Sequence, residues 1–119
     1  MSAESSVTEA VVHRHLQAFL EQRGVAALME DYADDARFYS EAKVYRGKQE
    51  ISGFFVDFVG ALPVGGVDRF SLRSRWVDGD VAYLTWSVGD DIPLGTDTFV
   101  VNDGKIVSQT FAMYAAPAR

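Results

Sequence analysis

RFSLRSRWVDGDVAYLTWSV, residues 69–88, is the stretch that decides the fold. Its side chains alternate between apolar and polar, and a period of two is typical of a strand with one face on a core. The Asp78-Gly79-Asp80 segment interrupts the alternation with a hairpin signal. We therefore predict two antiparallel strands, of which the second covers Val81 to Val88.

The strand-like pattern continues to the C-terminal end of the chain. Residues 89–95, which include Pro93, are expected to form a connection. A strand over residues 96–101, a hairpin at residues 102–104 and a last strand from Lys105 to about Tyr114 follow. The C-terminal half is thus expected to supply four long strands.

The N-terminal half has a helical period instead. Ser6 and Glu9 have capping-box spacing, so a helix is expected to begin near them after a short polar lead. Apolar positions then follow the helical spacing i, i+3, i+4 and i+7, which makes a single stripe: Val12, His15, Leu16 and Phe19.

Gly24 ends this pattern, and a shorter helix with Tyr32 on its apolar face is expected next. Residues 33–36 are expected to turn, and residues 37–40 to form a brief strand. Gly47 is expected to open a third, phenylalanine-rich helix. Helices followed by hairpin-linked strands predict an α+β fold with a mostly antiparallel sheet. One domain over residues 1–119, with a core at about 7–114, is expected for this length.

Composition narrows the function classes. The 119 residues are 48% hydrophobic and 13% aromatic, which is typical of a globular domain. No cysteine is present, so disulfides, thiolate zinc sites and cysteine nucleophiles are excluded. A net charge of −6 disfavours nucleic-acid partners. Without an apolar membrane span or a signal-like start, a cytoplasmic protein with no membrane association is expected. Two histidines on one helix make a poor metal site, so no metal or cofactor is expected.

Two segments carry a family resemblance. Residues 28–36, LMEDYADDA, followed by a strand and then by Arg46-Gly47, resemble the opening half of the nuclear transport factor 2-like superfamily. This superfamily includes SnoaL-like and ketosteroid isomerase-like proteins. Residues 97–108 resemble its last hairpin. The resemblance implies a cone-shaped, curved sheet wrapped by three helices around one apolar pocket, and a homodimer formed through the open sheet face. Aromatic residues such as Trp86 and Tyr83 fit that second face, and the register of Val81 to Val88 stays open, because a shift of one residue would exchange the two between pocket and dimer face.

The resemblance also points to catalytic residues. Asp97 matches the protonated acid that hydrogen-bonds the substrate oxygen in ketosteroid isomerases. Burial in an apolar pocket raises the pKa of such a carboxyl group and favours its neutral, proton-donating form. His15 matches their oxyanion tyrosine, and with Asp97 it forms an acid–base pair of the SnoaL-like kind. The alternatives are a solvent-facing Asp97 and a hydrogen-bonded core histidine.

One position departs from the isomerases. Aligning residues 33–36 places Ser40 where those enzymes carry their proton-shuttling aspartate. A serine hydroxyl with no adjacent base cannot take a proton from carbon near neutral pH. Ketosteroid isomerase activity is therefore not expected, although the pocket keeps its polar residues.

The remaining pocket residues are expected to be aromatic or amphipathic wall. They are Tyr32, Ser40, Phe54, Phe55, Phe58, Phe99, Gln109, Phe111 and Met113. Two functions fit these residues. The first is an isomerase, cyclase or hydrolase acting on a small, apolar carbonyl compound. The second is a non-catalytic domain that binds a hydrophobic ligand or acts through its dimer surface.

Overall fold

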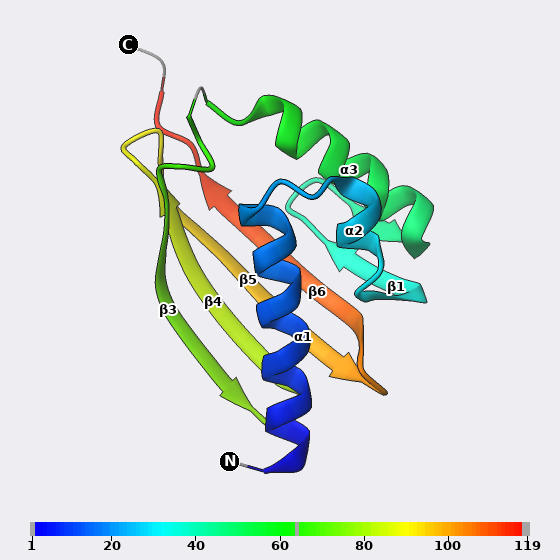
Figure 1. The fold of residues 1–119 in the computed structure, drawn as a ribbon. Coiled ribbons are helices and arrows are strands. Elements are labelled where there is room, and N and C mark those ends of the chain that lie inside the picture. Colours follow the sequence, from blue (N-terminus) through cyan, green and yellow to red (C-terminus); the bar gives the residue numbers. More distant parts are fainter. Residues whose placement is uncertain (1, 64, 118–119) are drawn as a thin grey trace.

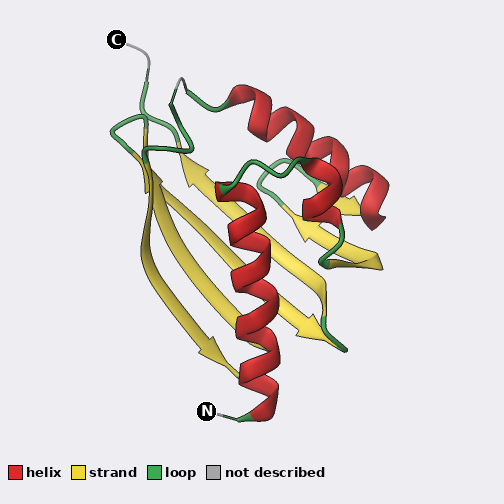
Figure 2. Cartoon of the chain, viewed as in Figure 1, coloured by secondary structure: helices red, strands yellow, loops and turns green. Residues whose placement is uncertain are grey.

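A computed structural model describes residues 2–63 and 65–117 of the chain. Within them, three helices and six strands form two layers (Figures 1 and 2). In chain order the elements are α1 (Ala3–Leu20), α2 (Val25–Met29), β1 (Tyr32–Tyr39), β2 (Val44–Arg46), α3 (Gly47–Ala61), β3 (Phe70–Asp78), β4 (Val81–Val88), β5 (Ile92–Asn102) and β6 (Lys105–Tyr114).

The six strands form one curved, unclosed sheet in the order β2-β1-β6-β5-β4-β3. Only the β1–β6 pair is parallel, and each of the other four pairs is antiparallel. The predicted α+β class with a mostly antiparallel sheet is confirmed. Both C-terminal hairpins lie where the Asp-Gly signals predict them, at residues 79–80 and 103–104.

All three helices lie on one face of the sheet (Figure 1). The helix α1 crosses β3, β4 and β5, while α3 packs on β1 and β2 and contacts α2. The apolar core fills the space between these layers, and its most deeply buried side chains include Val12, Tyr32, Phe38, Ile51 and Ile106. The opposite face of the sheet has no helix over it in the described residues.

The first helix begins earlier than its sequence pattern predicts. The side chain of Ser2 accepts a hydrogen bond from the backbone N–H of Ser5, so Ser2 is the N-cap and the expected capping box at Ser6 is wrong. The hydroxyls of Ser5 and Thr8 then bond the backbone of Gly79 at the β3–β4 turn. These contacts tie the polar lead to the sheet. None of the described helices is long and apolar enough to cross a membrane.

The segment expected to turn at residues 33–36 is instead part of β1, and Tyr32 begins this strand instead of ending a helix. The pairing of β1 with β6 shifts between Tyr32 and Arg37. This irregularity leaves both Asp34 and Asp35 exposed although they are adjacent. Two neighbouring aspartates suggested a loop, whereas they are the solvent side of a bulged strand.

The strand β5 also begins earlier than expected, because Ile92 and Pro93 already belong to it. Proline is tolerated at such a strand start. On β4, Trp86 is 4% exposed and Tyr83 is 40% exposed. The register of β4, which the sequence leaves open, therefore places Trp86 on the pocket side and Tyr83 on the outer face. The outer partner of Tyr83 is Trp76, which lies directly opposite on β3.

Candidate functional site

An apolar cavity of about 60 Å³, the inner pocket, lies between the helices and the inner face of the sheet. Its wall includes phenylalanines from all parts of the chain: Phe19, Phe55, Phe58, Phe70, Phe99 and Phe111. Three polar or ionisable side chains also reach it, namely His15 from α1, Asp97 from β5 and Gln109 from β6. Such a pocket, apolar with a few convergent polar groups, is typical of a small-molecule site.

A second pocket of about 520 Å³, the outer pocket, lies at the surface between the end of α1, α2 and the segment that follows α3. It shares Phe19 and Leu28 with the inner pocket. The two pockets are therefore adjacent.

Asp97 is the buried acid of the inner pocket, with 8% of its surface exposed. Its Oδ2 accepts a hydrogen bond of 2.7 Å from Trp86 Nε1, and its Oδ1 accepts one of 2.8 Å from Gln109 Nε2. Burial raises the pKa of Asp97 to about 6, although both hydrogen bonds and the nearby ring of His15 act to lower it. The carboxyl group therefore changes charge close to physiological pH.

Gly95 makes the contact between Trp86 and Asp97 geometrically possible. Gly95 lies directly opposite Trp86 on the neighbouring strand. A Cβ at this position would lie 2.2 Å from the indole ring. The missing side chain lets the indole lie across β5, where it reaches Asp97 two residues farther along.

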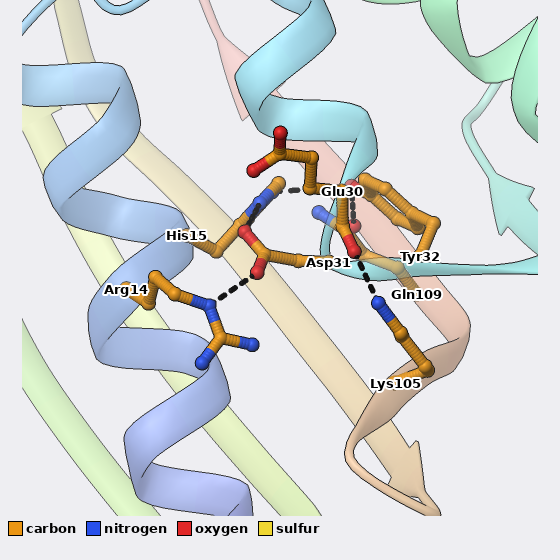
Figure 3. A network of polar contacts seen from close by, with 7 residues as sticks. All are labelled: Arg14, His15, Glu30, Asp31, Tyr32, Lys105 and Gln109. Atoms are coloured by element: carbon orange, nitrogen blue, oxygen red, sulfur yellow. Dashed lines mark hydrogen bonds and ion pairs between the residues drawn. The ribbon is translucent and has the colours of Figure 1, made fainter.

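His15 lies between two hydrogen-bonding partners (Figure 3). Its Nδ1 is 3.1 Å from Oδ2 of Asp31, and its Nε2 is 3.2 Å from the hydroxyl of Tyr32. Asp31 is 2% exposed, and its other oxygen accepts a 2.7 Å hydrogen bond from Arg14 Nε. Burial acts to raise the pKa of Asp31, but the hydrogen bonds and charges of His15 and Arg14 outweigh it, and the pKa is lowered. An ionised Asp31 only accepts, so Nδ1 of His15 carries a proton.

The groups of Asp31 and Asp97 belong to one continuous hydrogen-bonded chain. The hydroxyl of Tyr32 contacts Nε2 of His15 and also donates to Oε1 of Gln109 at 2.5 Å. Gln109 in turn donates to Asp97. Burial, with the charges of Asp97 and Asp31, raises the pKa of Tyr32 well above its usual value, so this group stays a phenol.

The structure brings most of the expected residues to the inner pocket and leaves others elsewhere. His15, Phe55, Phe58, Asp97, Phe99, Gln109 and Phe111 line it. Tyr32 is 1% exposed and lies behind His15, and Phe54 packs on Phe38. Ser40 and Met113 are not among the residues that line it, and Met113 is 36% exposed.

Ser40 belongs to the turn between β1 and β2. Its hydroxyl accepts from the backbone N–H groups of Ala42 and Lys43 and donates to the carbonyl of Lys43. This position caps a turn and contributes no group to the inner pocket.

Direct pairing of His15 with Asp97, as expected from the sequence, is not the arrangement of the described residues. The direct partner of His15 is Asp31, and the link to Asp97 runs through Tyr32 and Gln109. Sequence reasoning missed Asp31, because an acid at the end of a short helix gives no sign of burial. Among the described residues, no three His, Cys, Asp or Glu side chains lie together as metal ligands.

Comparison with known proteins gives the family context. The family model described as a SnoaL-like domain matches residues 12–109. No curated protein has a sequence that matches this chain significantly. The matched range includes all the polar residues of the inner pocket.

Solved structures share the fold at low sequence identity. A nuclear transport factor 2-like protein of unknown function from Mesorhizobium loti is 21% identical, with 97% of each chain covered and a TM-score of 0.77. A Sinorhizobium meliloti protein provisionally assigned as a polyketide cyclase is 23% identical, with 86% of this chain and 93% of that one covered and a TM-score of 0.68. A Kribbella flavida protein provisionally assigned as a ketosteroid isomerase is 19% identical, with 96% and 82% covered and a TM-score of 0.67.

Replacing Gly95 tests the packing that positions Trp86. We expect Gly95→Ala to lower the free energy of unfolding by about 1–3 kcal/mol, because the new methyl group overlaps the indole ring. Urea denaturation measures this change. In a Trp76→Phe background, which leaves Trp86 as the only tryptophan, the emission spectrum should shift as the indole moves. Gly53→Ala on α3 is the control, since its Cβ meets nothing within 4 Å. Equal stability of both variants and an unchanged spectrum would contradict this assignment.

Replacing Asp97 tests the cost of burying its charge. An unfolded Asp97 loses its proton near its ordinary pKa of 3.8, whereas the folded one keeps it to about 6. The folded form holds more protons between these values, so its stability falls as the pH rises through this window. We expect Asp97→Asn to gain up to about 3 kcal/mol of unfolding free energy over the parent protein between pH 4 and pH 8. Urea denaturation at both pH values, with the exposed Asp57→Asn as control, measures the gain. If the difference in unfolding free energy between Asp97→Asn and the parent protein did not change with pH, burial would not raise the pKa of Asp97.

Proposed function

The chain belongs to the SnoaL-like domain family, and we propose that its inner pocket receives a small, mostly apolar carbonyl compound and exchanges a proton with it through Asp97. The observation that carries the proposal is a carboxyl group buried in an aromatic pocket with its pKa raised to about 6. A group with such a pKa takes up and returns protons efficiently near neutral pH. Perturbed acids in clefts are frequent at functional sites.

The reaction step that suits this acid is proton transfer at the carbon next to a carbonyl group. The ionised Asp97 takes the proton, and its partly apolar surroundings increase its basicity. Isomerisations and cyclisations of carbonyl compounds both use this step. Two structural neighbours are provisionally assigned to these reaction classes, which agrees with the proposal without deciding the reaction.

His15 is the second acid–base group of the proposal. Asp31 holds its Nδ1 proton, so the proton that His15 can exchange is the one on Nε2, which faces the Tyr32 hydroxyl. The residue lines the inner pocket, and Tyr32 and Gln109 connect it to Asp97. The acid–base pair is therefore indirect in this proposal.

The sizes of the two pockets constrain the ligand. The inner pocket, at about 60 Å³, has room for about four water-sized groups. Only the reactive part of a ligand fits there, and the rest would extend past Phe19 and Leu28 into the outer pocket. An elongated, apolar molecule with its carbonyl group at one end meets this requirement.

A non-catalytic, ligand-binding domain is the second candidate. Both oxygens of Asp97 already accept hydrogen bonds from the protein, which is also how a purely structural acid is satisfied. The outer sheet face exposes aromatic side chains, among them Trp76 and Tyr83, which supports the expected homodimer. Ketosteroid isomerase activity is not proposed, because Ser40 offers neither a base nor a place in the pocket.

Exchange of α-deuterium separates the two candidates. Deuterated cyclohexanone and 2-decalone are incubated with the protein in ordinary water, and loss of deuterium is followed by NMR. We expect protein-dependent exchange that increases as the pH rises through about 6, because Asp97 must be ionised to act as the base. Asp97→Asn should reduce this exchange at least about 100-fold.

Binding is measured in parallel through Trp86, in a Trp76→Phe background that removes the exposed second tryptophan. Quenching of Trp86 by the same ketones should persist in the Asp97→Asn variant. The exposed Asp57→Asn is the matched control and should leave both readouts unchanged. Binding without exchange in the parent protein favours the non-catalytic function, and exchange that survives Asp97→Asn excludes Asp97 as the proton carrier.

A further inference from the structure

The side-chain amide of Gln109 lies between two proton-carrying groups. It is 2% exposed, and its Oε1 is 2.5 Å from the Tyr32 hydroxyl while its Nε2 is 2.8 Å from Oδ1 of Asp97. An amide donates at one end and accepts at the other. Its orientation therefore determines which neighbour must donate and which must accept.

In the orientation of the structure, the Gln109 NH₂ group donates to an ionised Asp97, and its oxygen accepts from the Tyr32 hydroxyl. The bond to Gln109 takes the only proton of the Tyr32 hydroxyl, so toward Nε2 of His15 the Tyr32 oxygen can only accept. Because Nδ1 already donates to Asp31, His15 must carry protons on both nitrogens. This state has a charged imidazolium and a charged Asp97.

Turning the amide by half a rotation creates a second state in which every contact is satisfied. The Gln109 oxygen now accepts from a protonated Asp97, and its NH₂ group donates to the Tyr32 oxygen. The Tyr32 proton turns to Nε2 of His15, which is unprotonated, while Nδ1 still donates to Asp31. Both His15 and Asp97 are neutral in this state. The two states contain the same number of protons.

The two other charge combinations leave a buried mismatch. If Nε2 of His15 and Asp97 both lack a proton, the Tyr32 hydroxyl has one proton but faces two acceptors, Nε2 and the Gln109 oxygen. If Nε2 and Asp97 both carry a proton, the Tyr32 oxygen faces two donors, Nε2–H and the Gln109 NH₂ group, and its own proton has no acceptor. Buried polar groups without a partner are costly, so both combinations are disfavoured.

We propose that Gln109 is a positioning residue that makes the site carry one exchangeable proton, held either by Nε2 of His15 or by Asp97. The inference deepens the proposed function, in which Asp97 is the proton carrier. A ligand that gives a carbon-bound proton to Asp97 becomes an enolate, because the electrons of the C–H bond form the C=C bond and those of the C=O π bond move to the oxygen. The Nε2 proton of His15 leaves its contact with the Tyr32 hydroxyl and binds this oxygen, which makes the enol. The site then passes from the first state to the second, and its hydrogen bonds remain satisfied.

The charged and titratable groups around His15 come from several elements. Arg14 on α1 reaches Asp31, which follows α2 and bonds His15 directly. Tyr32 of β1 contacts His15, and Asp97 of β5 lies beyond it. The rings of Phe55 and Phe99 contact the imidazole edge to face and carry no charge. Asp31 stays ionised in both states, so the change concerns His15 and Asp97 alone.

The experiment is an NMR titration of the two histidine rings, and it requires no ligand. His13 is exposed and serves as the internal reference. Asp97→Asn places a permanent NH₂ donor or carbonyl acceptor opposite Gln109. The indole N–H of Trp86 only donates, so the carbonyl oxygen of the new side chain faces Trp86 and its NH₂ group faces Gln109. This NH₂ group needs an acceptor, which selects the second orientation of the Gln109 amide. We expect the pH at which His15 is half protonated to fall by about one unit in this variant.

Gln109→Leu tests whether the amide transmits this effect. In the Gln109→Leu background, Asp97→Asn should shift the His15 midpoint by less than half as much as in the parent background. Tyr32→Phe breaks the same chain at its centre with a smaller change, and it serves the same purpose if Gln109→Leu does not fold. Equal shifts in all backgrounds, or no shift in Asp97→Asn alone, would overturn the proposal. If Asp97→Asn shifts the His15 midpoint through Gln109 but the parent protein exchanges no α-deuterium, this inference stands and the proposed reaction is refuted. If the parent protein exchanges α-deuterium but the shift is absent, the proposed reaction stands and this inference is refuted.

Discussion

Two hydrogen bonds, from the indole of Trp86 and the amide of Gln109, hold the carboxyl group of Asp97 inside an aromatic pocket. The rest of the site depends on this contact, because a buried carboxylate without donors would be far more costly than one with two. The donors do not remove the whole cost, and the pKa of Asp97 stays raised to about 6. Gly95 contributes by leaving space for the indole.

The second buried carboxyl group has the opposite properties. Asp31 is less exposed than Asp97, yet its pKa is lowered because Arg14 and His15 both donate to it. Asp31 contributes stability that is present above its unfolded pKa and is lost as the pH falls, whereas ionising Asp97 costs stability as the pH rises. Two acids in one polar chain thus have separate roles: one orients an imidazole, and the other is able to change its charge.

Local sequence signals predicted much of the fold correctly and misplaced particular elements for physical reasons. The Asp-Gly turns and the period-two runs located β4 and β6 to the residue, since hairpin geometry depends on a few neighbouring residues. The first residues of α1 were missed because their helix is tied to the distant Gly79. The pair Asp34-Asp35 suggested a turn because the bulge that exposes both comes from pairing with β6. A similar shift on β3, between Leu72 and Ser74, turns Trp76 to the outer face.

By itself, the sequence determined the α+β class, the hairpins and the chain order of the helices, because propensity, periodicity and turn chemistry are local properties. It also pointed to His15, Asp97 and Gln109, since each stands on a strand or helix face with apolar neighbours. Only the tertiary structure decided which acid meets which base. Asp31 and Gln109 are 78 positions apart in the chain, and Tyr32 is 77 positions from the amide that it bonds. Contacts over such separations depend on the parallel pairing of β1 with β6 and on the placement of α1 across the sheet, and no local pattern encodes them.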